Sequence, residues 1–238
     1  MDRFYRRQFR TENAFSFKIE QEESDLFLVC DSELKEPISR ELSVLRNQLK
    51  SYIKKNPLFQ TSLSPIDVEI NAPLLIQNMA LAARTYNVGP MAAVAGSIAQ
   101  SLGDSFKSQC NKLIIENGGD IFIKTREPVT FSVYAGPVSP FTGKLKFRFP
   151  PQPDGMGICT SSAKIGHSLS FGNADALVAI ASTADVADAA ATSLANKIKN
   201  KEDITRIIEE EKNRQILKAL IIVLDENMGI WGDIELAG

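Results

Sequence analysis

A tight turn between two short apolar segments places the strongest constraint on the fold of this chain. The segments are Lys112–Glu116 and Ile121–Lys124, and the turn between them reads Asn117-Gly118-Gly119-Asp120. Asn-Gly and Gly-Gly readily supply the positive φ angles that a hairpin turn needs, so the two segments are predicted to be paired strands. Strands joined in this way run antiparallel, which favours a sheet of antiparallel neighbours over a doubly wound parallel one.

The rest of the chain shows a mixture of extended and helical patterns. Residues 15–19 and 26–30 are apolar segments on either side of a polar break, which suits a second hairpin. Apolar residues recur at helical spacing from Pro37 to Lys55. Further helices are predicted at 73–86, from Pro90, at 184–199 and at 203–214, and further strands at 129–134, 144–149, 157–161, 176–181, 216–224 and 229–236. This grouping predicts an α+β fold, with a mostly antiparallel mixed sheet and helices packed on it.

The size and charge of the chain limit its organisation and its partners. It has 238 residues, of which 44% are hydrophobic, so a single domain spanning 1–238 can bury a large core. The net charge is -2, from 27 basic and 29 acidic residues, which gives no surface suited to a phosphate backbone. We therefore expect no nucleic-acid partner, and the sequence leaves open whether the protein forms a homo-oligomer.

No segment of the sequence predicts export or membrane insertion. Residues 1–7 are charged but are not followed by an apolar run of signal-peptide length. The longest apolar stretch, Leu217–Leu224, is interrupted by Lys218 and is too short to cross a bilayer. We expect a cytoplasmic protein that has no membrane partner.

The three cysteines show no spacing typical of a metal site. Cys30, Cys110 and Cys159 stand far apart in the sequence, and none belongs to a CxxC pair. This pattern argues against a disulfide framework and against a zinc knuckle. We expect all three to be small buried apolar residues.

The common phosphate-binding, hydrolytic and metalloprotease motifs do not occur, and four weaker features remain. The first is the helix that opens at Gly89-Pro90, where Ala92, Gly96, Ala99 and Gly103 form a ridge with little side-chain bulk. The uncovered N–H groups at such a helix start can hold a phosphate. Close packing of the helix against a neighbour explains the same residues.

The second and third features are polar turns. Gly118 and Gly119 would let a flat ligand lie against the main chain, although a plain hairpin turn needs them as well. Ser161 and Ser162 end a predicted strand just before His167, the only histidine of the chain. Together these three side chains could surround one ligand, but an exposed loop histidine is the alternative.

The fourth feature is the pair Asp188 and Thr192 on the alanine-rich helix. The i, i+4 spacing places the carboxylate one turn from the hydroxyl, so that the two oxygens could bind a hard cation such as Mg²⁺. Asp185, Asn196 and Lys199 fall on the same helical face. An ordinary solvated face would therefore also explain the pair.

Taken in order along the chain, these features resemble the ApbE superfamily of Mg²⁺-dependent enzymes that process FAD and attach FMN to protein threonines. The order is a small-residue helix opening, NGGD, TSS, a histidine and DAAAT, between about Val88 and Leu194. The likeness is strongest to a cytoplasmic ApbE-like branch of archaea and bacteria. It implies an ApbE-like, T-fold-like domain.

The resemblance also implies roles for individual residues. The side chains of Asp188 and Thr192, with the backbone carbonyl of Ala92, match the Mg²⁺ ligands of the family. Other positions match residues beside the flavin nucleotide: Gly118, Gly119, Ser161, Ser162 and His167.

Two positions depart from the family pattern. Ala95 stands where the family has a lysine before the glycine, and Ser168-Leu169-Ser170-Phe171 replaces a short apolar pair followed by Asp-Pro. The metal pair is retained, but a cation that could steady a phosphate is lost, so no catalytic residue is assigned.

The resemblance predicts a Mg²⁺-dependent enzyme that binds FAD, FMN or another small nucleotide. Whether it acts as an FAD pyrophosphatase or as an FMN transferase is left open. The alternative is a non-catalytic ligand-binding or assembly protein that keeps the ApbE-like fold.

Overall fold

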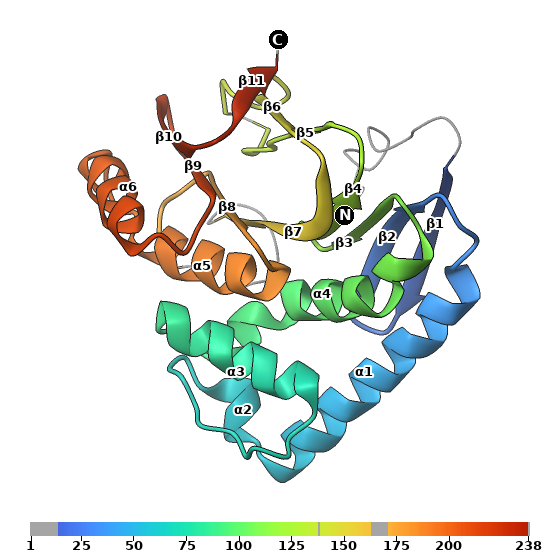
Figure 1. Ribbon diagram of the computed structural model, residues 1–238. Helices are drawn as coiled ribbons and strands as arrows, with labels where there is room; N and C mark the ends of the chain where they lie inside the picture. Colours follow the sequence, from blue (N-terminus) through green and yellow to red (C-terminus); the bar gives the residue numbers. More distant parts are fainter. Residues whose placement is uncertain (1–13, 138, 163–170, 238) are drawn as a thin grey trace.

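The computed structural model describes residues 14–137, 139–162 and 171–237, and its centre is an eight-stranded sheet (Figure 1). In spatial order the strands are β1 (Phe15–Gln21), β2 (Ser24–Cys30), β3 (Leu113–Asn117), β4 (Asp120–Thr125), β7 (Gln152–Ser161), β8 (Ala176–Ala181), β9 (Ala219–Leu224) and β10 (Asn227–Gly232). Every pairing in this sheet is antiparallel. The predicted α+β class with an antiparallel sheet is therefore confirmed.

The hairpins follow from the local sequence. Asn117 pairs with Asp120 across the β3–β4 turn, where Gly118 and Gly119 take φ angles of 71° and 111°. Only glycine adopts both angles without steric cost, so the turn predicted from the sequence is the one that forms. In the β1–β2 hairpin the turn begins at Glu22, which has a φ of 52°.

A smaller sheet covers one face of the large sheet. It consists of β5 (Val129–Ser132), β6 (Lys146–Phe149) and β11 (Glu235–Ala237), again paired antiparallel. Phe131, Phe147 and Phe149 of this sheet pack with residues of β2, β3, β4, β7, β8 and β9. Because helices cover the opposite face, every residue of β8 and β9 is buried.

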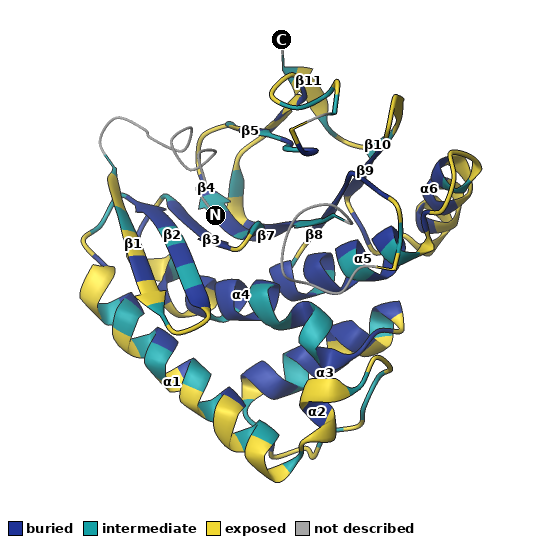
Figure 2. Ribbon diagram, turned by 180° about the vertical axis from the view of Figure 1, so that it is seen from behind, coloured by how far each residue is buried: buried dark blue, intermediate teal, exposed yellow. Residues whose placement is uncertain are grey.

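The helices lie on the other face of the large sheet (Figure 1). They are α1 (Lys35–Lys55), α2 (Leu58–Thr61), α3 (Leu74–Tyr86), the 3₁₀ turn η2 (Pro90–Ala93), α4 (Val94–Phe106), the 3₁₀ turn η3 (Lys107–Gln109), α5 (Ala184–Lys197) and α6 (Glu202–Arg214). Helices α4 and α5 lie on the middle strands of the sheet, while α1 contacts β1 and α6 contacts β10 at its two edges. Helix α3 packs outside α4 and α5. Figure 2 shows the result, with α4 and α5 largely buried while α1 and α6 each keep an exposed stripe.

The starts of α4 and α5 differ from simple sequence rules. The helix predicted from Pro90 begins as the 3₁₀ turn η2 before it becomes α-helical at Val94. At α5 no side chain caps the helix from Thr183, whose hydroxyl donates to Asp185. The first N–H of α5, that of Ala184, donates to Gln100 Oε1 at 2.8 Å, so a tertiary contact with α4 caps this helix. None of the described helices has the length and apolar character that a membrane span requires.

Candidate functional site

Asp188 lies buried at the crossing of α5 and α4. Its side chain is 8% exposed, and its Oδ2 accepts a hydrogen bond of 2.8 Å from the backbone N–H of Gly96. Gly96 belongs to the first turn of α4, whose N–H groups have no partner within the helix. The carboxyl group therefore occupies the helix N-terminus, where the dipole favours negative charge.

The solvated-face explanation of Asp188 is wrong. Asp185 and Asp188 are 7% and 8% exposed, because α5 is enclosed by α3, α4, β7 and β8. A helical wheel locates only the apolar stripe, and on a helix packed on several sides the polar residues are also buried. The part of this face that carries Asp185 and Asp188 is directed into the molecule, whereas Asn196 is half-buried and Lys199 is exposed.

The small-residue ridge of α4 allows this approach. A Cβ atom added at Gly96 would lie 2.2 Å from the carbonyl oxygen of Ala184 and 2.7 Å from the Cβ of Asp188. At Gly103 it would lie 2.4 Å from the Phe122 ring. The close-packing explanation of the ridge is thus correct at both glycines. The N–H of Gly96, one of the groups that could hold a phosphate, is bound by the carboxyl group of Asp188.

The glycine turn lies beside the same helix start. Asn117 Nδ2 donates to the carbonyl of Ala95 at 3.1 Å, and Gly119 N–H donates to Glu116 Oε1 at 2.8 Å. A Cβ added at Gly119 would meet no atom within 4 Å, so the outer side of the turn is open. The first turn of α4 therefore connects Asp188 on one side to the glycine turn on the other.

A second buried carboxyl group and a thiol accompany Asp188. Asp120 is 9% exposed, and its Oδ1 accepts the N–H of Thr160 at 3.3 Å. Burial raises the pKa of Asp120 to about 7, although the nearby Cys159 thiol and the N–H of Thr160 favour the carboxylate. Burial, and next the charge of Asp120, raise the pKa of Asp188 well above its usual range.

Cys159 completes this buried group. Its thiol donates to the carbonyl of Ala184 at 3.2 Å, and burial together with the charges of Asp120 and Asp188 raises its pKa. Within the described residues, neither Asp120 nor Asp188 forms an ion pair with lysine or arginine. A cation bound here would relieve the repulsion between the two carboxylates.

The other predicted site residues that the structure describes are half-buried. Thr192 is half-buried one turn after Asp188, and Ala92 is half-buried in η2. Ser161 and Ser162 are half-buried at the end of β7. His167 lies outside the described residues. The structure thus joins Asp188, the α4 start and the glycine turn, whereas the roles of Thr192, Ala92, both serines and His167 stay predictions.

A cavity of about 360 Å³ adjoins the start of α4 on the side facing α1. Ala95 and Asn117 line it, and so do the cationic side chains of Arg46 and Lys50 from α1. Arg46 donates to Ser24 Oγ at 2.6 Å and pairs with Glu22 at 2.6 Å. The sequence did not predict a role for Arg46 or Lys50, because the amphipathic pattern of α1 does not show which of its polar side chains lie near the start of α4.

Comparison with known proteins identifies relatives over most of the chain. The family model described as AbpE bacteria matches residues 6–217. A UPF0280 protein of Methanocaldococcus jannaschii is 39% identical over 198 residues, which are 80% of this chain and 80% of that protein. A UPF0280 protein of Methanococcus maripaludis is 37% identical over 226 residues, covering 92% of this chain and 91% of that protein.

Solved structures of ApbE proteins share the fold. The apo form of the flavinyl transferase ApbE from Pseudomonas stutzeri superposes with a TM-score of 0.61 at 12% identity, covering 92% of this chain and 93% of that chain. The ApbE protein of Thermotoga maritima gives a TM-score of 0.60 at 12% identity, with 94% and 97% covered. At such low identity the likeness establishes the fold alone, and it confirms the ApbE resemblance predicted from the motif order. From the match of the family model over residues 6–217, we conclude that this chain belongs to the AbpE bacteria family.

Proposed function

We propose that this protein is a Mg²⁺-dependent enzyme that binds FAD and either hydrolyses it or transfers its FMN part. The observation that carries the proposal is the buried carboxyl group of Asp188, which meets the first turn of α4. Two further motifs of the ApbE resemblance adjoin the same turn, namely the small-residue helix opening and the glycine turn. The solved structures that share the fold include proteins titled flavinyl transferase.

The buried groups suit a hard divalent cation. Asp188 and Asp120 are buried carboxyl groups whose pKa values are raised, which is the expected state of an anionic site without its counterion. Mg²⁺ prefers oxygen ligands and keeps several waters, so Asp188, Thr192 and the carbonyl of Ala92 would suffice to hold it. When bound, Mg²⁺ supplies Lewis-acid polarisation of a diphosphate.

The protein's own groups would bind and orient the nucleotide. Gly118, which is exposed, and Gly119, where the main chain is open, would seat the flat flavin ring. Ser161, Ser162 and His167 would donate or accept hydrogen bonds to its polar groups. We assign no proton transfer to any of these residues.

Positive charge for the diphosphate would come from α1. Ala95 replaces the family lysine, but Arg46 and Lys50 line the cavity to which Ala95 also contributes. The Arg46 side chain is only 11% exposed, so a phosphate bound to it would be partly desolvated, which strengthens the interaction. Glu22 and Glu23, which now pair with Arg46, lie on the β1–β2 turn and would have to give way to a phosphate.

Ligand binding and chemistry can be tested separately. Thermal unfolding should be measured with FAD, FMN and ADP, each with and without Mg²⁺, because a tight ligand raises the midpoint by mass action. FAD with Mg²⁺ should give the largest rise, and incubation of the two with the protein should release AMP. A protein that binds no flavin in either condition would refute the proposal.

Asp188→Asn is the decisive variant. The amide keeps an oxygen for the Gly96 N–H but removes the charge that would bind the metal, so the Mg²⁺-dependent part of the thermal shift should vanish. AMP release should fall by about 100-fold or more, since metal catalysis contributes several kcal/mol and each 1.4 kcal/mol is about tenfold. Asp154→Asn on the exposed part of β7 is the matched control. If Asp188→Asn keeps both properties, the metal assignment is wrong.

A non-catalytic ligand-binding or assembly protein is the second candidate. The observation in its favour is that Ala95 stands at the lysine position while the Gly96 N–H is already bound to Asp188. This candidate expects a flavin-induced thermal shift without AMP release and without transfer of FMN to a protein threonine.

A further inference from the structure

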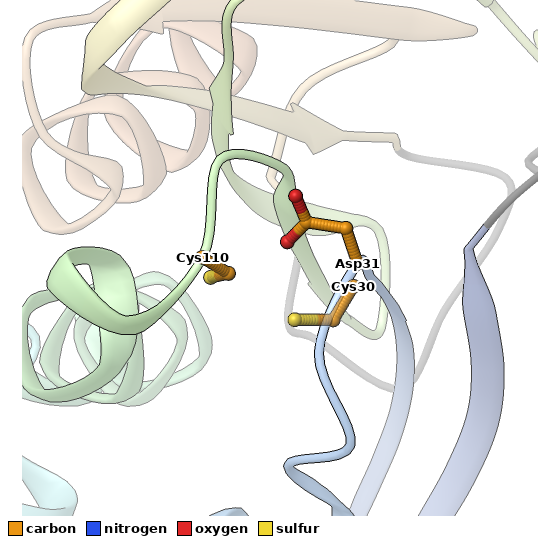
Figure 3. Close-up of side chains that lie close together, drawn as sticks. All are labelled: Cys30, Asp31 and Cys110. Atoms are coloured by element: carbon orange, nitrogen blue, oxygen red, sulfur yellow. The ribbon is translucent and has the colours of Figure 1, made fainter.

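Two cysteines that are 80 positions apart in the sequence meet at the end of β2. Cys30 ends β2, Asp31 follows it, and Cys110 follows η3 (Figure 3). The two sulfurs and a carboxylate oxygen of Asp31 lie within 4.8 Å of one another. Both cysteines are buried and free, whereas the aspartate is accessible to solvent. This group is separate from Asp188 and the glycine turn.

The backbone holds the three residues in place without any ligand. The N–H of Asn111 donates to both carboxylate oxygens of Asp31 at 3.1 Å, and Asp31 N–H donates to the carbonyl of Lys112 at 3.3 Å. The Ser32 hydroxyl donates to the carbonyl of Gln109 at 3.1 Å. The segments 30–32 and 109–112 are therefore clamped together, which lowers the ordering cost of binding.

The surroundings of the sulfurs suit thiolate ligands. Ser32 N–H donates to Cys30 Sγ at 3.4 Å, and a hydrogen bond to a metal ligand orients that ligand and tunes its affinity for the metal. Lys124 Nζ donates to the carbonyl of Cys110 at 2.8 Å, so an ammonium group lies beside the cluster. Two thiolates and a carboxylate carry three negative charges. A bound divalent cation would leave one net negative charge, which the ammonium group of Lys124 offsets.

We propose that Cys30, Cys110 and Asp31 bind a soft divalent cation of the Zn²⁺ type, with water as the fourth ligand. Tetrahedral Zn²⁺ with bonds of about 2.3 Å to sulfur and about 2.0 Å to oxygen needs ligand atoms roughly 3.5–3.8 Å apart. The observed separation of up to 4.8 Å closes to that distance with shifts of about 1 Å. Each thiol releases its proton to solvent on binding, and no electron transfer is involved.

The bound cation would stabilise the central sheet where β2 ends and β3 begins. Cys30 packs in the core with α1 and α4, and Cys110 lies in the segment that leads into β3. A metal bridging them would fix the end of β2 to the start of β3 and should raise the unfolding midpoint. Mg²⁺ avoids sulfur ligands, so this site and the proposed Mg²⁺ site would select different ions.

Cobalt provides the test, because thiolate-to-Co²⁺ charge transfer absorbs in the near ultraviolet whereas carboxylate-bound Co²⁺ does not. The full chain is reduced with a phosphine, stripped with a chelator and titrated with Co²⁺ in excess Mg²⁺. We expect the band to saturate at one equivalent and to disappear when Zn²⁺ is added. Zn²⁺ should also raise the thermal midpoint of the stripped protein.

Variants locate the site. Cys30→Ser and Cys110→Ser should each abolish the band, while Cys159→Ala removes the third cysteine and should retain it. Asp31→Asn changes an accessible side chain, and it should keep the band while weakening Co²⁺ affinity by about tenfold or more. Far-ultraviolet circular dichroism checks that each variant is folded, and if the cysteine variants do not fold, Asp31→Asn still decides.

Several results would overturn the inference. The inference is wrong if the reduced wild-type protein gives no charge-transfer band with Co²⁺. It is also wrong if the band persists in both Cys30→Ser and Cys110→Ser. A Cys30–Cys110 disulfide in oxidised protein, combined with no Co²⁺ binding after reduction, would show a redox pair instead. The inference does not depend on the flavin proposal, since AMP release plays no part in the test.

Discussion

Single residues at and beside the α4–α5 crossing combine buried carboxyl groups with close backbone packing. Asp120 and Asp188 are carboxyl groups placed where water cannot solvate their charge. Gly96 supplies both the N–H that Asp188 accepts and the missing Cβ that lets α5 approach. The hydrogen bonding of the buried carboxyl group and the packing of the two helices therefore depend on the same few atoms.

The stability of the metal-free protein should fall as the pH rises towards neutrality. Burial raises the pKa of Asp120 from 3.8 to about 7 in the folded protein. The resulting stabilisation of the folded state is fully present when the pH is below the pKa of the unfolded chain, and it is lost as the pH rises through about 7. Glu116, Cys159 and Asp188 surround it. At about 1.4 kcal/mol per pKa unit, the loss amounts to a few kcal/mol.

Asp120→Asn should reduce this slope, and Asp188, whose pKa burial also raises, should account for a slope that remains. The free energy of unfolding is measured by urea denaturation between about pH 4 and about pH 8 with a chelator present. Asp154→Asn, at an exposed position of β7, should leave the slope unchanged. An equal slope in wild type and Asp120→Asn would show that Asp120 is not the titrating group.

Gly96→Ala should destabilise the protein although alanine is the better helix former. The gain in helix propensity is about 1 kcal/mol, but the new Cβ would lie 2.2 Å from the backbone carbonyl oxygen of Ala184, which cannot rotate away. Overpacking of this kind costs about 1–3 kcal/mol or more. The midpoint of urea denaturation measures the difference, and Ser101→Ala in the same helix is the control. A stabilised Gly96→Ala would mean that α5 can move away from α4.

At the scale of elements, buried polar contacts join α3 to α6, and the sequence pattern of neither helix predicts them. Tyr86, at the end of α3, donates to Glu211 of α6 at 3.0 Å, and Glu211 is 1% exposed. Arg214 bonds to the other oxygen of Glu211 at 3.1 Å, and its guanidinium lies 4.5 Å from the centre of the Tyr86 ring. Burial and the Glu211 charge raise the pKa of Tyr86. These contacts fix α6 against α3.

Tyr86→Phe should therefore cost about 1–3 kcal/mol, because it removes a donor from a buried carboxylate and leaves the packing unchanged. Tyr52→Phe is the matched control, since the Tyr52 hydroxyl bonds at 2.8 Å to Glu69 at an exposed position. That change should stay within about 0.5 kcal/mol. Equal costs at the two tyrosines, measured by urea denaturation, would contradict the assignment of Tyr86 as a buried link.

At the scale of the whole molecule, one central sheet separates two cores. Helices pack on one of its faces, and the small sheet packs on the other through Phe131, Phe147 and Phe149. The rings of Phe131 and Phe149 stack at 5.1 Å. Since the strands of the large sheet belong to both cores, we predict that the two cores unfold together.

Phe147→Ala tests this coupling. The side chain is fully buried, so its loss should cost about 3–5 kcal/mol. Fluorescence of Trp231, the single tryptophan, reports on β10, and circular dichroism reports on the helices. Both signals should shift to the same lower urea midpoint, whereas Phe15→Ala, at a side chain that is 53% exposed, should shift neither by much. Separate midpoints would contradict a single cooperative domain.

The sequence by itself determined most of the elements and the pairing of two hairpins. Asn117-Gly118-Gly119-Asp120 encodes a hairpin through the φ angles of its glycines, and Ala176–Ala181 encodes a strand through its apolar run. Both signals are local, so neighbouring residues suffice to read them. The order of the motifs also pointed to the ApbE resemblance, which the family model and the fold comparisons bear out.

Only the tertiary structure decided which polar residues are buried and which residues meet. It places the buried side chain of Asp188 against Gly96 and Arg46 in the same cavity as Ala95. It also places the sulfurs of Cys30 and Cys110 within 4.8 Å of each other, although no CxxC spacing marks these residues. The physical reason is that burial and proximity depend on what packs against an element from elsewhere in the chain. The periodicity of one helix or strand carries no information about those partners.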